Sequence, residues 1–112
     1  MLYMYDMHML DLRKILGFEW DVGNIEKSYE KHGITPKEAE KVFLDENLQV
    51  ERDVQHQEIE ERFVAVGKIQ ENKTLFVVFT LRKDRVRVIS ARIADKKERS
   101  IYDKEIKKNT KI

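Results

Sequence analysis

The chain of 112 residues lacks cysteine altogether, has little proline or glycine, and contains no long uninterrupted apolar run. Without cysteine it has no disulfide scaffold, no cysteine zinc site and no thiol nucleophile, which fits a reducing cytoplasm; we expect a cytoplasmic protein. One proline and four glycines exclude a collagen-like chain, and the interrupted apolar runs exclude a membrane span. Since 41% of the residues are apolar and 9% aromatic, we expect one globular domain.

Charged residues are abundant, but they nearly cancel to a net charge of +1. Residues 1–81 contain 10 basic and 16 acidic side chains, a net −6, whereas residues 82–112 contain 12 basic and 5 acidic ones, a net +7. A basic final quarter on an acidic body indicates contact with a polyanion or with an acidic partner. The alternative is a solvated surface helix held by salt bridges.

The first 16 residues are rich in Met and Leu but are interrupted by charged side chains, so we expect neither a signal peptide nor a span. Three interpretations remain open: an extra strand or helix, a partner-binding arm, or an extension with little structural role. We favour the last. A single domain is then expected over residues 17–108, followed by a tail over residues 109–112.

The domain is expected to begin with a short strand and a helix. Residues 18–20 alternate as a strand, and the helix that follows ends at Gly33, because glycine suits the left-handed position after a helix. On this helix Ile25, Tyr29 and His32 share one face, so we expect them to pack inward.

A second helix opens with stronger signals. Thr35 caps it, Pro36 takes the first helical position, and Glu38 completes a capping box. We expect this helix to end near Asp45.

The rest of the domain changes to the two-residue period of β-strands and then returns to a helix. Four strands are expected over residues 48–52, 62–69, 74–81 and 85–93, joined by a polar loop at 53–60 and tight connections at 70–73 and 82–84. Asp95 and Glu98 open a basic helix that carries Ile101, Tyr102 and Ile106 on one side. The order β-α-α-β-β-β-β-α predicts a small α+β fold, with helices packed against an antiparallel sheet.

Familiar catalytic motifs are absent: the sequence has no glycine-rich phosphate loop, no His-Glu-x-x-His and no nucleophile elbow. Its histidines, His8, His32 and His56, are far apart, so they form a metal site only if folding gathers them. We expect no metal and no cofactor.

Cations near the predicted strands suggest chemistry on RNA. An arginine can hold a phosphodiester through two hydrogen bonds and stays charged throughout a reaction. Metal-independent cleavage needs a base for the 2′-hydroxyl proton, a cation for the charge on phosphorus, and an acid for the leaving oxygen. His32, His56 or Glu61 can transfer protons. The candidate cations are Arg62, Arg87 and Arg92, within a set that includes Arg82 and Arg85.

These residues also have structural alternatives. His32 precedes the glycine that ends its helix, and it can simply pack there and bond the last carbonyls. Glu61 and Arg62 can form a surface ion pair, and Trp20 is expected in the core, not on the surface as a stacking platform for bases.

The spacing of Arg87 and Arg92 raises a separate question. On an ideal strand these two residues point to opposite faces, because their spacing is odd. They line one cleft only if a bulge intervenes or if one of them acts from the end of the strand.

The sequence resembles the BrnT family, the toxins of bacterial type II toxin–antitoxin pairs, over about Gly17 to Tyr102. The matching pieces occur in the family's order: Phe18-Glu19-Trp20-Asp21, Lys31-His32-Gly33, Glu38-Ala39, Val42-Phe43, Glu61-Arg62-Phe63, Gly67, Val78-Phe79-Thr80 and Ile89-Ser90-Ala91-Arg92. The resemblance implies a RelE-like ribonuclease fold, cleavage of RNA, and inhibition of translation and growth. It also implies a BrnA-like antitoxin with a ribbon-helix-helix DNA-binding region, which would let the complex repress its own operon.

Carried onto this sequence, the resemblance implies two groups of functional residues. The catalytic set is His32, Glu61, Arg62, Arg87 and Arg92, and the substrate-binding set is Lys31, Ser90 and Tyr102. We therefore expect an RNA endonuclease toxin of little or no sequence specificity. Two alternatives of other classes stay open: a non-catalytic module that pairs with an antitoxin, and a stand-alone RNA-binding domain.

Overall fold

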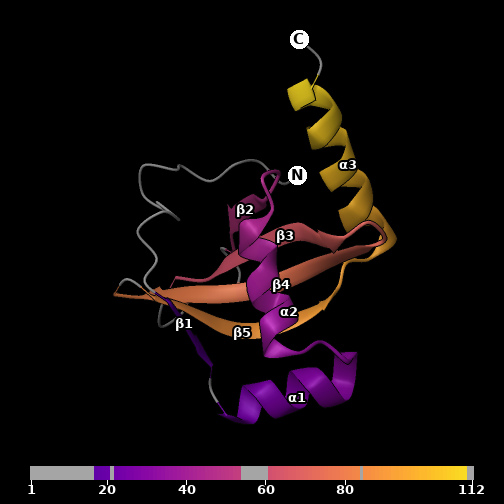
Figure 1. Cartoon of the computed structure of the whole chain (residues 1–112). Helices are drawn as coiled ribbons and strands as arrows, with labels where there is room; N and C mark the ends of the chain where they lie inside the picture. The colour runs from indigo at the N-terminus through magenta and orange to yellow at the C-terminus, as the bar shows by residue number, and fades with distance from the viewer. Residues whose placement is uncertain (1–16, 21, 54–60, 84, 111–112) are drawn as a thin grey trace.

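The structure, a computed structural model, describes residues 17–20, 22–53, 61–83 and 85–110. Its elements, shown in Figure 1, are β1 (Gly17–Trp20), α1 (Val22–His32), α2 (Pro36–Lys41), the 3₁₀ helix η2 (Val42–Leu44), β2 (Gln49–Arg52), β3 (Phe63–Gln70), β4 (Lys73–Arg82), β5 (Arg85–Ile93) and α3 (Lys96–Thr110). The predicted order and the α+β class are confirmed. The predicted N-terminal extension, His8 and His56 lie outside the described residues, and α3 continues past the domain end expected at residue 108.

The five strands form one sheet in the order β1-β5-β4-β3-β2, with the predicted central strand β4 in the middle. Strands β2 to β5 are antiparallel, as predicted, but β1 pairs with β5 in parallel, so the sheet is mixed. Short connections join β3, β4 and β5 and force neighbouring strands to reverse direction. No such turn joins β1 to β5, which are far apart in sequence, so tertiary packing sets their relative direction.

One face of the sheet is covered by α2 and η2, which cross it in Figure 1. Buried residues of all four antiparallel strands meet Ala39 and Val42 there, and Trp20 packs against this core as predicted. Three aromatic rings fill its centre: Phe43 meets Phe79 edge to face at 5.1 Å, and Phe79 stacks on Phe63 at 5.4 Å. Most of the apolar burial that stabilises the fold lies on this side.

Both predicted helix signals in this region are confirmed. Gly33 has a φ of +69° and its amide donates to the carbonyl of Tyr29, which ends α1. At the start of α2 the Thr35 hydroxyl accepts from the amide of Glu38, whose carboxylate accepts from the amide of Thr35. The Glu38 carboxylate also accepts from Lys73 on β4, which lowers the pKa of Glu38 and attaches α2 to the sheet.

The inward packing predicted for Tyr29 is wrong. Its side chain is 56% exposed, and the side chain of Ile25, predicted on the same face, is not described. His32 is half-buried. The helix α1 packs against β5, near one edge of the sheet and not over its centre, so only part of the helix surface can be buried.

Gly67 on β3 lets η2 approach the sheet closely. A Cβ at this position would lie 2.9 Å from Val42 Cγ1 and 3.1 Å from the Val42 carbonyl oxygen. We expect Gly67→Ala to lower the free energy of unfolding by about 1–3 kcal/mol, because backbone atoms must move. Urea unfolding measures this, with Gly17→Ala as the matched control, since a Cβ there meets nothing within 4 Å. Equal losses in both variants would contradict the prediction.

The other face of the sheet is partly covered by α3. Tyr102, Ile101 and Ile106 of this helix pack on Val64 and Val66 of β3 and on apolar residues of β4, as the predicted apolar side of the helix requires. No helix among the described residues is long and apolar enough to span a membrane.

Candidate functional site

Arg92 near the end of β5 is held in place by contacts to Glu98 and Phe76. Its Nη1 and Nη2 donate to the two carboxylate oxygens of Glu98 at 2.8 Å each, and its guanidinium lies 4.0 Å from the ring centre of Phe76. The hydrogen bonds from Arg92 to Glu98 raise the pKa of Arg92, so its charge is permanent. Glu98 also closes a capping box with Asp95 at the start of α3. A guanidinium, 35% exposed along its side chain, is thus fixed where α3 begins.

A β-bulge in β5 decides which faces Arg87 and Arg92 share. The pairing with β4 leaves one extra residue, Ile89, between Val88 and Ser90. This residue shifts the alternation of side chains, so Arg87 and Arg92 lie on the same face of the sheet despite their odd spacing. Ser90 lies between them on that face, which is the one that α3 partly covers.

Arg87 lies towards the other end of this face, and Arg62 directly precedes β3. Arg87 pairs with Thr80, and the Thr80 hydroxyl donates to the carbonyl of Glu61 at 2.6 Å, so the residues that precede β3 lie beside Thr80. The Glu61 carboxylate is 3.5 Å from Arg52, and both side chains are exposed. Glu61 therefore forms an ion pair with Arg52.

His32 and Lys31 lie in the last turn of α1, the helix that packs against β5. Partial burial lowers the pKa of His32, and the positive charges of Lys31 and Arg92 lower it further. The imidazole is therefore neutral at pH 7 and can accept a proton. The helix α1 packs against β5, the strand that carries Arg92.

The candidate residues form two groups on this side of the molecule. The β4 partners of Arg92 and Arg87 are Phe76 and Thr80, four residues apart, which corresponds to about 13 Å along a strand. One phosphodiester cannot contact both groups, but a strand of several nucleotides can. We call them the His32 group and the Arg62 group; the first contains Lys31, His32 and Arg92, and the second contains Glu61, Arg62 and Arg87.

Tyr102 takes a different position from the one that its expected substrate-binding role requires. Its side chain is only 1% exposed, and its hydroxyl donates to the Asp45 carboxylate. Burial and this hydrogen bond raise the pKa of Tyr102, so the hydroxyl stays protonated. The geometry supports a structural role for Tyr102, because the core surrounds the group that would have to meet RNA.

Sequence reasoning missed two residues beside the His32 group. Glu98 was expected only as a helix cap, but its carboxylate also accepts both hydrogen bonds from the Arg92 guanidinium. Arg92 stands six residues earlier, near the end of β5. Tyr29 was expected in the core, but its side chain is exposed. Its spacing of three residues from His32 places both side chains on one side of α1. Among the described residues, no three histidine, aspartate or glutamate side chains gather closely enough to hold a metal ion.

The chain is a small α+β protein with a mixed sheet, and two arginines of β5 lie on the face that α3 partly covers. A family model described as "Ribonuclease toxin, BrnT, of type II toxin-antitoxin system" matches residues 20–98, and the chain belongs to this family. The crystal structure of the Brucella abortus ribonuclease toxin BrnT has a similar fold: the TM-score is 0.54 at 20% identity, over 71% of this chain and 97% of that one. No curated protein matches the sequence.

Proposed function

We propose that the chain is a metal-independent endoribonuclease toxin, which cleaves RNA in the cytoplasm and thereby inhibits translation and growth. The observation that carries this proposal is the imidazole of His32 at the end of α1, a helix that packs against the strand with the clamped guanidinium of Arg92, in a chain of the ribonuclease toxin family. A base and a permanent cation are two of the three components of cleavage by 2′-hydroxyl attack.

In this mechanism His32 takes the proton of the 2′-hydroxyl, and the 2′-oxygen attacks the adjacent phosphorus. The bond from phosphorus to the 5′-oxygen breaks, and the leaving 5′-oxygen takes a proton from water. Arg92 stabilises the negative charge that builds on the phosphoryl oxygens; its clamp to Glu98 means that little reorganisation is needed. Lys31 binds a neighbouring phosphate oxygen. Glu61 is less suited as the base, since it lies in the other group and pairs with Arg52.

The Arg62 group is proposed to bind the same RNA away from the bond that breaks. Arg87 lies on the same face of the sheet as Arg92, with Ser90 between, and Arg62 directly precedes β3, which suits contacts to successive phosphates. These contacts carry no base identity, which is consistent with cleavage of little sequence specificity.

Cleavage of a labelled RNA by the purified protein in the presence of EDTA tests the proposal. We expect fragments that end in a 2′,3′-cyclic phosphate, because the 2′-oxygen is the nucleophile. Activity that disappears with EDTA and returns with a divalent metal would show that the mechanism is wrong. Induction in a bacterial host, followed by growth and RNA integrity, then tests toxicity.

Lys31→Gln is expected to move the acidic limb of the pH profile upward. The charge of Lys31 lowers the pKa of His32, so its removal should raise that pKa towards the ordinary 6.5. His32 then loses its neutral form at a higher pH, and kcat/KM falls earlier as the pH decreases. The profile of kcat/KM against pH measures this, with Lys27→Gln on the same helix as the control. A limb that stays in place would exclude His32 as the base.

A type II family implies an antitoxin partner. We propose that this partner is BrnA-like, with a ribbon-helix-helix DNA-binding region, and that the complex represses its own operon. Co-expression with the candidate antitoxin should restore growth, and the purified complex should bind operator DNA that the chain alone does not bind. Growth arrest that persists with the antitoxin present would contradict this assignment.

A second candidate function is a non-catalytic module of the toxin fold that only pairs with an antitoxin. Two observations favour it: Arg92 is occupied by Glu98, and the Arg62 group is too far away to complete one catalytic centre. Antitoxin binding without RNA cleavage at any pH would support this function over the first.

A further inference from the structure

An exposed aromatic side chain lies next to the proposed base. Tyr29 is 56% exposed on α1, and its spacing of three residues from His32 makes the two side chains neighbours on the helix surface. Among the aromatic residues that the structure describes, Tyr29 is the one whose side chain is exposed. Neither the core nor the proposed cleavage step uses this ring, and the flat face of an aromatic ring is a good platform for a nucleobase.

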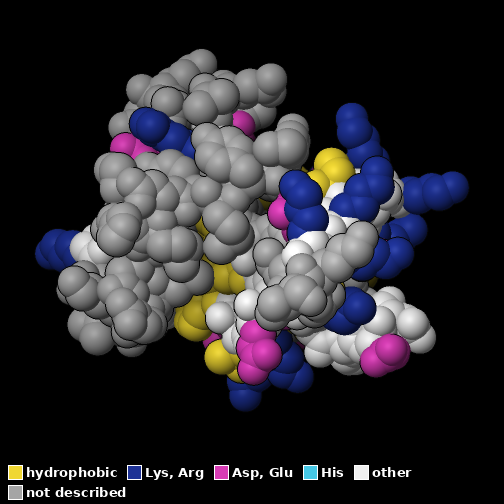
Figure 2. Space-filling model, turned by 90° about the horizontal axis from the view of Figure 1, so that it is seen from above, with side chains coloured by type: hydrophobic (Ala, Val, Ile, Leu, Met, Phe, Trp, Pro, Cys, Tyr) yellow, Lys and Arg dark blue, Asp and Glu magenta, His cyan; other side chains and the backbone are white. Residues whose placement is uncertain are grey.

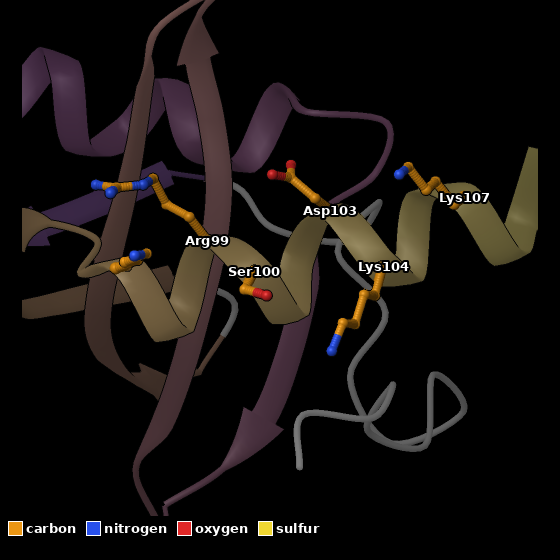
Figure 3. A pocket seen from close by; sticks show the side chains of 6 residues that line it. Arg99, Ser100, Asp103, Lys104 and Lys107 are labelled. Atoms are coloured by element: carbon orange, nitrogen blue, oxygen red, sulfur yellow. The ribbon is translucent and has the colours of Figure 1, made fainter.

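A stripe of mostly basic side chains follows α3 on its solvent side. We call it the basic stripe; it lines an open surface hollow of about 340 Å³ and consists of Lys96, Arg99, Ser100, Asp103, Lys104 and Lys107. Figure 3 shows these side chains along successive turns of the helix. Four cations and one acid leave the stripe with a charge of +3. In Figure 2, lysine and arginine side chains gather on the side where α3 stands.

The His32 group lies between these two features. In Figure 1 the end of α1 and the start of α3 are at the same end of the sheet. Arg92 links them, since it lies on β5, against which α1 packs, and is clamped to Glu98 on the first turn of α3. Arg99 donates to the Ala94 carbonyl at 3.0 Å, which attaches the start of the basic stripe to the end of β5.

We propose that single-stranded RNA binds along this path, with one base stacked on Tyr29, the scissile phosphate between His32 and Arg92, and the next phosphates on the basic stripe. The inference deepens the proposed function and rests on it. Cations recur along the stripe about once per helical turn, or roughly 5.4 Å, which is comparable to the spacing of phosphates in an extended strand. The stripe spans about 16 Å from Lys96 to Lys107, enough for a few nucleotides.

Single-stranded RNA fits these features better than a duplex or an acidic protein. A duplex keeps its bases stacked inside, so it leaves none for Tyr29. An acidic protein would use the basic stripe but has no need for an exposed ring beside a catalytic imidazole. A strand with splayed bases uses the ring, the imidazole and the cations together.

Binding of a labelled 2′-O-methyl RNA strand to the full chain tests the path without any cleavage, because the nucleophile is blocked. We expect Tyr29→Ala to weaken binding about 5- to 150-fold, and Tyr29→Phe to bind like the parent, since a phenyl ring also stacks. The double variant Lys104→Gln/Lys107→Gln should bind more weakly and show a salt dependence whose log–log slope is shallower by about 1.4, for two lost phosphate contacts.

The matched control is Lys37→Gln/Lys41→Gln, which removes the same charge from exposed positions on α2, across the sheet. An equal loss in this control, tighter binding of a duplex than of a single strand, or unchanged binding by Tyr29→Ala would overturn the inference. So would variants of the basic stripe that bind RNA normally but bind the antitoxin more weakly. If the variants bind RNA like the parent and the parent cleaves RNA, the binding path is wrong but the ribonuclease function stands. If the variants bind RNA more weakly but the parent cleaves none, the ribonuclease function is wrong but the binding path stands.

Discussion

Replacing His32 with alanine is expected to lower the rate of RNA cleavage by roughly 10²- to 10⁴-fold, the usual contribution of a general base. The lowered pKa of His32 favours the neutral imidazole at pH 7, the form that can accept the proton. His32 lies half-buried in the last turn of α1, so the fold should lose no more than about 1 kcal/mol. Single-turnover cleavage at saturating enzyme isolates the chemical step.

Two controls make this result specific. His56→Ala removes the other histidine considered for proton transfer and should leave the rate unchanged. Added imidazole should restore part of the activity of His32→Ala, because it can occupy the space left by the side chain and accept the same proton. Full activity in His32→Ala, or its loss in His56→Ala, would transfer the role of base to a different residue.

The second large effect is expected on stability. Asp45 follows η2, and its carboxylate accepts hydrogen bonds from three parts of the chain: the amide of Asn47 at 2.9 Å, the amide of Lys68 on β3 at 2.7 Å, and the buried hydroxyl of Tyr102 on α3. Asp45→Ala leaves these donors without their acceptor. We expect the free energy of unfolding to fall by about 2–5 kcal/mol, since each unpaired buried donor costs about 1–3 kcal/mol. Urea unfolding measures this.

A double-mutant cycle with Tyr102→Phe separates the contact from the rest of the site. Tyr102→Phe alone should cost about 1 kcal/mol, because Asp45 keeps its two backbone donors. The combined variant should lose less than the sum of the two, because the phenyl ring leaves no hydroxyl to be stranded when Asp45 is absent. Strictly additive losses would show that Asp45 and Tyr102 do not act as a pair.

Local signals predicted most of the secondary structure. The Thr35–Glu38 and Asp95–Glu98 capping boxes start α2 and α3 where expected, and Gly33 ends α1 in the left-handed conformation. These features depend on residues a few positions apart, so the sequence contains all of the information they need.

The candidate site was only partly predictable. His32, Arg62 and Arg92 were recognised as chemically suitable residues, but their spacing in sequence does not say which of them meet. The extra residue Ile89 cannot be read from β5 itself, because a bulge is defined by the pairing with β4. The burial of Tyr102 likewise depends on its packing against Val64 and Val66 of β3, far away in the sequence.

By itself, the sequence determined the order of the elements, the ends of the helices and the presence of a basic final quarter on an acidic body. These properties follow from backbone preferences and composition, which act within a few residues. Only the tertiary structure decided that β1 runs parallel to β5, that Arg87 and Arg92 share a face, and that Tyr29 is exposed while Tyr102 is buried. Each of these depends on contacts between segments far apart in the chain, whose free energy arises only when the sheet and its helices pack together.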